Sequence, residues 1–248
     1  MAWDIFIIFV AVYFAFVIPM QIAFEGEFFS HEVFDFANLV FGFLFFLDIL
    51  ISFRTSFFNQ NTGEEVLAPK QIAVNYLSSF RFQVDLISAI PFDLILLWFI
   101  DAETAHRFKI TSLIKLLRVF RISAMITYMN TTEDVKLLLE LCKLLFFLLL
   151  YIHCTACLIY LVADSDGSWI PTTYDYYMYQ DSYFDAPFRM RYLIAFYNAV
   201  LALTGNEINP KNELHIFTTS FLLIFGSLII ANLFGTIAVI VSSMNRKA

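Results

Sequence analysis

The chain has 248 residues, of which 60% are hydrophobic and 15% are charged, and its formal net charge is −7. Soluble globular domains average about 25% charged residues, so this composition excludes a soluble domain and predicts a protein that crosses a membrane several times. At about 20 apolar residues per transmembrane helix, roughly five to seven spans would account for most of the chain.

The hydrophobic segments predict an all-α membrane protein with six transmembrane helices. They cover about residues 3–24, 33–53, 82–100, 107–128, 135–162 and 214–244. Pro91 interrupts the third segment and should kink that helix. Between the fifth and sixth segments, residues 192–210 hold an apolar run that is too short to cross twice and that breaks at Thr204. Irregular backbone at membrane depth is tolerated where protein buries it or water lines it, so we expect a re-entrant pore loop here.

Charged residues divide between the two sides of the predicted membrane. The loops after the first, third and fifth spans are acidic, whereas the linker after the second span and the C-terminus carry Arg54, Lys70, Arg81, Arg246 and Lys247. Short loops rich in lysine and arginine stay in the cytosol, so both termini are expected to be cytosolic. The acidic face then lies outside, where it would concentrate cations near an entrance.

The fourth segment carries cations at multiples of three residues, with Ser112 in the one gap: Lys109, Lys115, Arg118 and Arg121. Charges inside a bilayer are costly and usually functional, so this stripe predicts a voltage-sensing helix. The expected counter-charges lie on the second and third spans and are Asp48, Asp85 and Asp93. A static ion-paired helix is the alternative. Because Ala124 and Thr127 continue the register without charge, we expect weak or modulatory voltage dependence.

The fifth segment carries Cys142, Cys154 and Cys157 together with His153. A Cys-x-x-Cys spacing also occurs in metal and redox motifs, but inside a lipid-facing helix we interpret these residues as packing thiols. We expect His153 to be a packed, hydrogen-bonded side chain. No catalytic residue, metal site or cofactor is predicted in this chain, and we do not expect an enzyme.

Several short motifs occur in an order and spacing typical of one channel superfamily. They are Leu47–Ile49 running into Ser52–Thr55, Tyr76–Leu77 followed by Phe82–Phe92, Leu116–Ile122, His153–Cys157 and Asp166–Pro171. With them the chain resembles the six-span core of the cation channels that include cyclic nucleotide-gated, hyperpolarisation-activated, ether-à-go-go and plant inward-rectifier members. The resemblance covers essentially the whole chain.

The resemblance implies a tetramer around a central pore. Residues 1–129 would form a voltage-sensor-like four-helix domain, and residues 130–248 would form the pore domain. Members of this superfamily often carry a cytosolic cyclic-nucleotide-binding domain after the sixth span, and whether one follows residue 248 is left open.

The pore loop departs from the potassium-channel pattern. Potassium-selective relatives present a Thr-Val-Gly-Tyr-Gly-type filter whose carbonyls replace the hydration shell. The filter predicted here consists of Thr204, Gly205, Asn206 and Glu207, which is closer to the Thr-x-Gly-Glu-x-Pro loop of cyclic nucleotide-gated channels. Four copies of Glu207 would form a carboxylate ring that suits cation selection and Ca²⁺ binding. The alternative is a simple extracellular turn between two spans.

The sixth segment is expected to line the inner pore. Gly226 and Gly235 are candidate bend points, because glycine weakens a helix locally. Asn232 is expected to face either the cavity or a neighbouring helix. A hydrophobic gate is expected at three positions farther along, Val239, Ile240 and Ser243.

These features predict a voltage-modulated, poorly selective cation channel subunit that forms a homo- or heterotetramer in a lipid bilayer. The expected permeant ions are K⁺ and Na⁺, with Ca²⁺ binding at Glu207, and nucleic acid is not an expected partner. A plasma or ciliary membrane is favoured, and an organelle membrane is left open. The alternative function is a non-conducting channel-fold subunit that serves as a structural component of a larger membrane complex.

Overall fold

The computed structural model describes residues 2–24, 31–58, 65–89, 116–117, 119, 133–167, 169 and 183–247. Helix dominates this part of the chain, and three of its helices are long and apolar enough to cross a membrane: Ile5–Ala23, Val135–Ser165 and Glu213–Ser242. They coincide with the first, fifth and sixth predicted segments, which confirms the expectation of a helical membrane protein. Most of the third and fourth predicted segments lies outside the described residues.

The elements form two compact units. Unit 1 consists of Met1–Ile18 and Phe29–Ile122, and unit 2 consists of Pro19–Phe28 and Ser123–Ala248. Helix α1 (Ala2–Ala23) is therefore shared between them, and the division falls at Pro19 inside that helix. A proline inside a helix removes one backbone hydrogen bond, so the helix is weakest where the two units divide it.

In unit 1, α1 runs antiparallel to α2 (His31–Ser52). The indole Nε1 of Trp3, at the start of α1, donates a 2.9 Å hydrogen bond to Oδ1 of Asp48 near the end of α2. Farther along α1, Phe14 meets Phe41 edge to face, with ring centroids 5.1 Å apart. Aromatic pairs favour this arrangement, so the polar and aromatic contacts together fix the register of the two helices.

A hairpin and two short helices follow α2. Strands β1 (Phe57–Phe58) and β2 (Glu65–Val66) pair antiparallel, which the hydrophobic segments did not predict. Helix α3 (Pro69–Leu77) begins with a proline, whose missing N–H is not needed in a first helical turn. Directly before the first turn of α4 (Phe80–Ala89), the Oγ of Ser79 accepts the Phe82 N–H at 3.2 Å and caps this helix.

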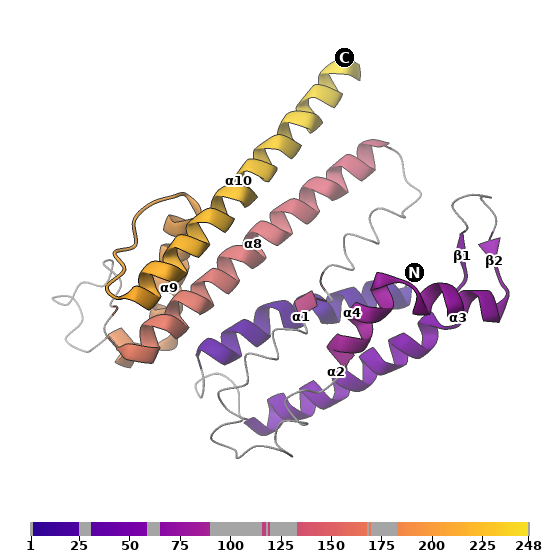
Figure 1. Ribbon diagram of the computed structural model, residues 1–248, viewed down its shortest axis with the longest axis horizontal. Helices are drawn as coiled ribbons and strands as arrows, with labels where there is room; N and C mark the ends of the chain where they lie inside the picture. Colours follow the sequence, from indigo (N-terminus) through magenta and orange to yellow (C-terminus); the bar gives the residue numbers. More distant parts are fainter. Residues whose placement is uncertain are drawn as a thin grey trace. The chain divides into compact units, whose positions relative to one another are not determined.

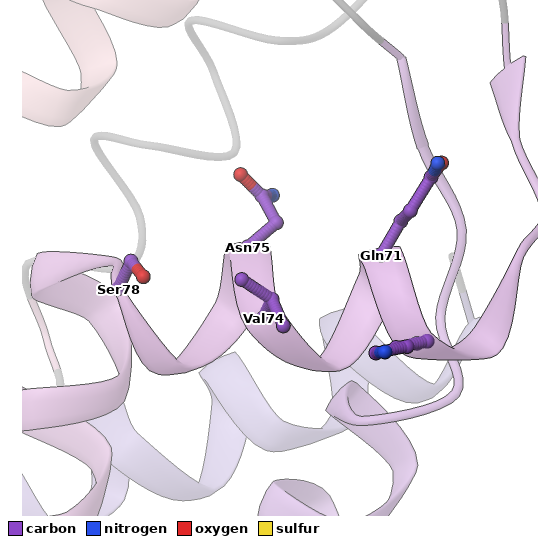
Figure 2. A pocket seen from close by; sticks show the side chains of 5 residues that line it. Gln71, Val74, Asn75 and Ser78 are labelled. Carbon is purple, nitrogen blue, oxygen red and sulfur yellow. The ribbon is translucent and has the colours of Figure 1, made fainter.

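The exposed side of α3 borders an open pocket of about 450 Å³ (Figure 2). It is lined by Lys70, Gln71, Val74, Asn75 and Ser78. Figure 2 shows Gln71 and Asn75, one helical turn apart, projecting to the same side of the helix. The lining contains no carboxylate, histidine or cysteine.

Unit 2 contains α8 (Glu133–Asp166), α9 (Phe188–Leu203) and α10 (Glu213–Lys247). Figure 1 shows α8 and α10 running antiparallel, with the shorter α9 packed where α8 ends and α10 begins. Ala195, Ala199 and Ala202 recur on one face of α9 and are completely buried. Small side chains at this spacing let membrane helices approach closely, so α9 sits tightly in the unit.

The end of α1 joins the core of unit 2 through Phe24. Its ring stacks on that of Tyr160 in α8, with centroids 4.0 Å apart, and meets Phe188 of α9 edge to face at 5.2 Å. Phe24, beyond Pro19, thus packs against α8 and against α9, the helix that holds the first part of the predicted pore loop.

Candidate functional site

Helix α9 is placed between two candidate spans without being one itself. Its 16 residues cover about 24 Å at 1.5 Å per residue, less than the roughly 30 Å hydrocarbon core of a bilayer. Residues 204–212, nine in number, then connect it to α10. The predicted filter residues occupy the start of this connection.

Gly205 ends α9 in a left-handed conformation, with φ at 79°. Its N–H donates to the carbonyl of Ala202 at 3.2 Å, and the N–H of Asn206 donates to the carbonyl of Leu201 at 2.9 Å. This pair of bonds is a Schellman motif, which satisfies carbonyls that a helix end leaves open. Glycine is favoured here because a side chain raises the energy of a positive φ.

Side chains in the same turn bond to one another. The Thr204 hydroxyl donates to the carbonyl of Val200 at 3.0 Å, and Nδ2 of Asn206 donates to the Thr204 Oγ1 at 2.7 Å. Glu207 is exposed, and within the described residues its carboxylate has no hydrogen-bond or ion-pair partner. The turn therefore engages its neutral groups and presents one free negative charge.

The residues after Glu207 are held by an aromatic contact from the segment that follows α8. Trp169 donates its Nε1–H to the carbonyl of Ile208 at 3.2 Å. The Trp169 ring also stacks on His215 in the first turn of α10, with centroids 4.7 Å apart and planes inclined by 26°. The sequence offered Trp169 only as part of the Asp166–Pro171 motif, and its role in this contact was missed.

His153 of α8 is buried and hydrogen-bonded, as predicted. Its Nδ1 lies 2.8 Å from the hydroxyl of Tyr192 on α9, and its Nε2 lies 3.8 Å from Sγ of Cys157. Cys157 is buried in the core of unit 2 as a free thiol, which confirms its interpretation as a packing residue. Within the described residues, no group of three or more potential metal ligands comes together.

A buried arginine near the start of α9 is a second feature that the sequence reasoning missed. Nη1 of Arg191 donates a 2.6 Å hydrogen bond to the hydroxyl of Tyr160, and the guanidinium carbon lies 5.5 Å from the centroid of that ring. The hydroxyl of Tyr183 donates to the Arg191 carbonyl at 3.1 Å. Burial raises the pKa of Tyr183 above its ordinary value of 10.0, so its phenol stays a neutral donor.

Gly226 lies where α10 comes closest to the end of α9. A Cβ atom at this position would lie 3.2 Å from the Cα of Leu203. Beside it, the Tyr151 hydroxyl of α8 donates a 2.7 Å hydrogen bond to the carbonyl of Leu222. The glycine thus permits close packing of α8, α9 and α10. Helix α10 continues through Gly226 without interruption.

All the other predicted inner-pore positions except Ile240 lie on a different face of α10 from Gly226. Asn232, Gly235, Val239 and Ser243 recur at intervals of three or four residues and so share one side of the helix. Of these, Asn232, Gly235 and Val239 are exposed. Ile240 follows Gly226 by 14 residues, about four turns, which places it on the same side of α10 as Gly226. The predicted gate residues are therefore not all on one face.

The predicted sensor is described only in part. Lys109, Lys115, Arg118, Arg121 and Asp93 lie outside the described residues. Asp48 and Asp85 are 2% and 1% exposed. Trp3 donates to Asp48, Tyr76 donates to Asp85 at 2.7 Å, and Nε of Arg81 lies 3.7 Å from the same Asp85 oxygen.

Comparison with known proteins places the chain in a family. A sequence model described as ion transport protein matches residues 1–248. The chain is 28% identical to the potassium channel KAT1 of Arabidopsis thaliana, over 94% of this chain and 34% of that protein. It is 28% identical to the voltage-gated inwardly rectifying potassium channel KCNH7 of Mus musculus, over 98% of this chain and 22% of that protein. The potassium voltage-gated channel protein eag of Drosophila melanogaster is 27% identical over the same shares, 98% and 22%.

The chain spans about a third or less of the length of these relatives. The matches confirm the superfamily that the sequence motifs indicated. The three membrane-length helices and the family match together identify an integral membrane protein. This chain belongs to the ion transport protein family.

Proposed function

We propose that this chain is the membrane core of a cation channel subunit, with α9 and residues 204–212 as its re-entrant pore loop. The observation that carries the proposal is the capped end of α9, which presents the free carboxylate of Glu207 between two candidate spans. The relatives named as potassium channels support cations as the transported ions. By this account the turn carries a selectivity filter made by residues 204–207.

The chemistry of the turn supports weak selection among cations. The N–H groups of Gly205 and Asn206 end α9, and residues 204–207 lack the Thr-Val-Gly-Tyr-Gly sequence whose successive carbonyls face the ion in a potassium filter. Four Glu207 carboxylates around one axis would instead attract cations by charge, and oxygen ligands of this type suit Ca²⁺. The proposed pathway therefore passes K⁺ and Na⁺, and Ca²⁺ binds in it.

The exposure of α10 supports assembly as a homo- or heterotetramer. Of the most apolar 18-residue stretch in α10, only 6% is buried in the single chain, whereas 44% of the corresponding stretch is buried in both α1 and α8. Phe217, Ile224, Leu228, Phe234 and Val239 are each more than 60% exposed. Neighbouring subunits and lipid would cover most of this surface, and the later part of the same side, with Asn232, Gly235 and Val239, would line the cavity.

Voltage modulation is proposed for residues 1–129, and pore formation for residues 130–248. Two of the relatives are named as voltage-gated, and the buried carboxylates of Asp48 and Asp85 are the acids that a sensor needs. Both termini are proposed to be cytosolic in a plasma or ciliary membrane, with six spans in all.

The proposal is tested with the purified full chain in planar bilayers, after its oligomeric state in nanodiscs has been measured. We expect a tetramer whose reversal potential, with K⁺ on one side and Na⁺ on the other, stays within a few tens of millivolts of zero. A reversal potential that follows the K⁺ gradient alone would contradict weak selectivity. A single copy held by other subunits, with no current, would instead support the structural-subunit alternative.

A further inference from the structure

Trp169 contacts the turn that carries Glu207 at one point, directly after the glutamate. We infer that Trp169 is a positioning residue that sets where Glu207 presents its carboxylate. This inference deepens the proposed function and rests on it. Trp169 itself would not touch the ion and would act through the backbone of Ile208.

The first observation is how buried the contact is within an exposed turn. Trp169, Ile208 and His215 are 2%, 1% and 0% exposed, whereas Glu207 and Asn209 on either side of Ile208 are exposed. Ile208 is therefore the anchor of the turn, and Glu207 is attached to it by one peptide bond. A buried carbonyl that loses its donor is costly, so the Trp169 Nε1–H holds Ile208 in place.

The second observation is that the other face of the contact is fixed. The Asn212 Oδ1 accepts the His215 N–H at 2.8 Å, which caps the first turn of α10. The N–H of Lys211 donates to Nδ1 of His215 at 3.4 Å. The backbone of His215 is thus held by Asn212, and its ring, on which Trp169 stacks, is held by Lys211, so the ring offers Trp169 a firm support.

The third observation is backbone strain beside the anchor. Asn209 has a φ of 52°, in the left-handed region that non-glycine residues adopt at a cost. Gly205 at the other end of the turn also has a positive φ, 79°. Contacts must offset the cost at Asn209, and the bond between Trp169 and Ile208 is the one next to it. Without that bond, residues 206–210 would sample other conformations.

For a ring of four carboxylates, this control has a direct consequence. Divalent binding requires several Glu207 side chains at the same depth, whereas passage of a monovalent ion tolerates wider positions. Loss of the Trp169 donor should therefore weaken divalent block more than it weakens monovalent current. Simple unfolding of the pore would reduce both together.

The test compares Trp169→Phe, which keeps an aromatic ring but removes the donor, with Tyr183→Phe. The control removes an aromatic hydroxyl that donates to the Arg191 carbonyl, away from the turn. One neutral hydrogen bond corresponds to about a two- to tenfold change in an equilibrium constant, so we expect Ca²⁺ block of the Na⁺ current to weaken by that factor in Trp169→Phe. The control should leave the block within about twofold.

The same substitution made in the Glu207→Gln background distinguishes positioning from a general structural effect. If Trp169 acts through the carboxylate, Trp169→Phe should add no further change in block once Glu207 is neutral. An equal change in both backgrounds would overturn the inference. The inference would also be overturned if Glu207→Gln alters Ca²⁺ block but Trp169→Phe leaves it unchanged. That result would not contradict the proposed function.

Hydrogen exchange of the peptide that covers residues 204–212, measured in nanodiscs, tests the positioning without any current. We expect Trp169→Phe to speed exchange in this peptide by about two- to tenfold, with the remainder of α10 unaffected. Unchanged exchange would overturn the inference, whether or not the chain conducts. A chain that does not conduct would refute only the proposed function. If Trp169→Phe does not assemble, His215→Leu removes the stacked ring while keeping the donor, and it should speed exchange in the same peptide.

Discussion

Gly226 of α10 faces the backbone of Leu203, the last residue of α9, so closely that a Cβ atom would lie 3.2 Å from the Leu203 Cα. The filter turn begins at the next residue, Thr204. The packing of α10 is therefore linked directly to the position of the helix end that carries the turn.

Replacement of Gly226 by alanine should destabilise the protein although alanine favours helix. The methyl group would press on backbone, which does not move aside easily, and overpacking of this kind costs about 1–3 kcal/mol. The control is Gly235→Ala, because nothing lies within 4 Å of the added Cβ there, and a gain of up to about 1 kcal/mol is expected from helix propensity. Thermal unfolding in detergent should show a lower Tm for the first variant and an equal or higher Tm for the second. The reverse order would contradict the close approach of the two helices.

Replacement of Gly205 by alanine tests the Schellman ending of α9. A left-handed backbone costs a residue with a side chain about 1–2 kcal/mol, so Gly205→Ala should lower the stability by that amount. Gly42→Ala in α2 is the matched substitution, since Gly42 has an ordinary φ and nothing within 4 Å of the added Cβ. Equal Tm values for the two variants would show that Gly205 does not adopt the positive φ.

The hydrogen bond between Arg191 and Tyr160 should contribute more to the stability of the fold than the exposed side chains of α9 do. A hydrogen bond to a charged group contributes about 1.5–3 kcal/mol, and here the cation is 7% exposed. We expect Arg191→Gln and Tyr160→Phe each to lower the free energy of unfolding by amounts of this order, and the double variant to lose less than their sum. Arg189→Gln, at an exposed position of the same helix, should have little effect. Strict additivity of the two changes would contradict the contact.

Alkaline pH should weaken the protein through Tyr183. Burial raises the pKa of Tyr183 in the folded state above the ordinary 10.0, so folding favours the protonated phenol. Its contribution is complete below pH 10 and declines as the pH rises from there toward the folded-state pKa. The Tm measured between about pH 9 and pH 11 should therefore fall more steeply for the natural chain than for Tyr183→Phe. Parallel pH profiles would show that Tyr183 is not buried as a neutral donor.

Local signals in the sequence predicted those features that depend on local composition. The first, fifth and sixth spans follow from long apolar runs, and the break after α9 follows from Thr204, Gly205 and the proline at 210. Contacts between distant residues leave no such signal. Trp169 and Ile208 are 39 residues apart, and Arg191 and Tyr160 are 31 apart, so no periodicity connects them.

Gly226 shows a related limit. The absence of a side chain serves a bend and a close contact equally well, so the sequence alone could suggest a hinge, whereas the structure places Leu203 against it. The predicted gate is a different case, because helix periodicity alone places Val239 and Ile240, which are neighbours in the chain, about 100° apart around α10. The sensor cations lie outside the described residues, and their role stays a prediction.

The central claim is that Glu207 lines a cation pathway, and Ca²⁺ block of the Na⁺ current tests it most directly. Glu207→Gln should be compared with Glu213→Gln, which removes the same charge from an exposed position in the first turn of α10. Removal of four carboxylates from one site should weaken block by at least about tenfold, since each is worth on the order of 1 kcal/mol in a partly hydrated setting. The account predicts that large shift for Glu207→Gln and little change for Glu213→Gln. Equal block in the two variants and the natural chain would contradict it.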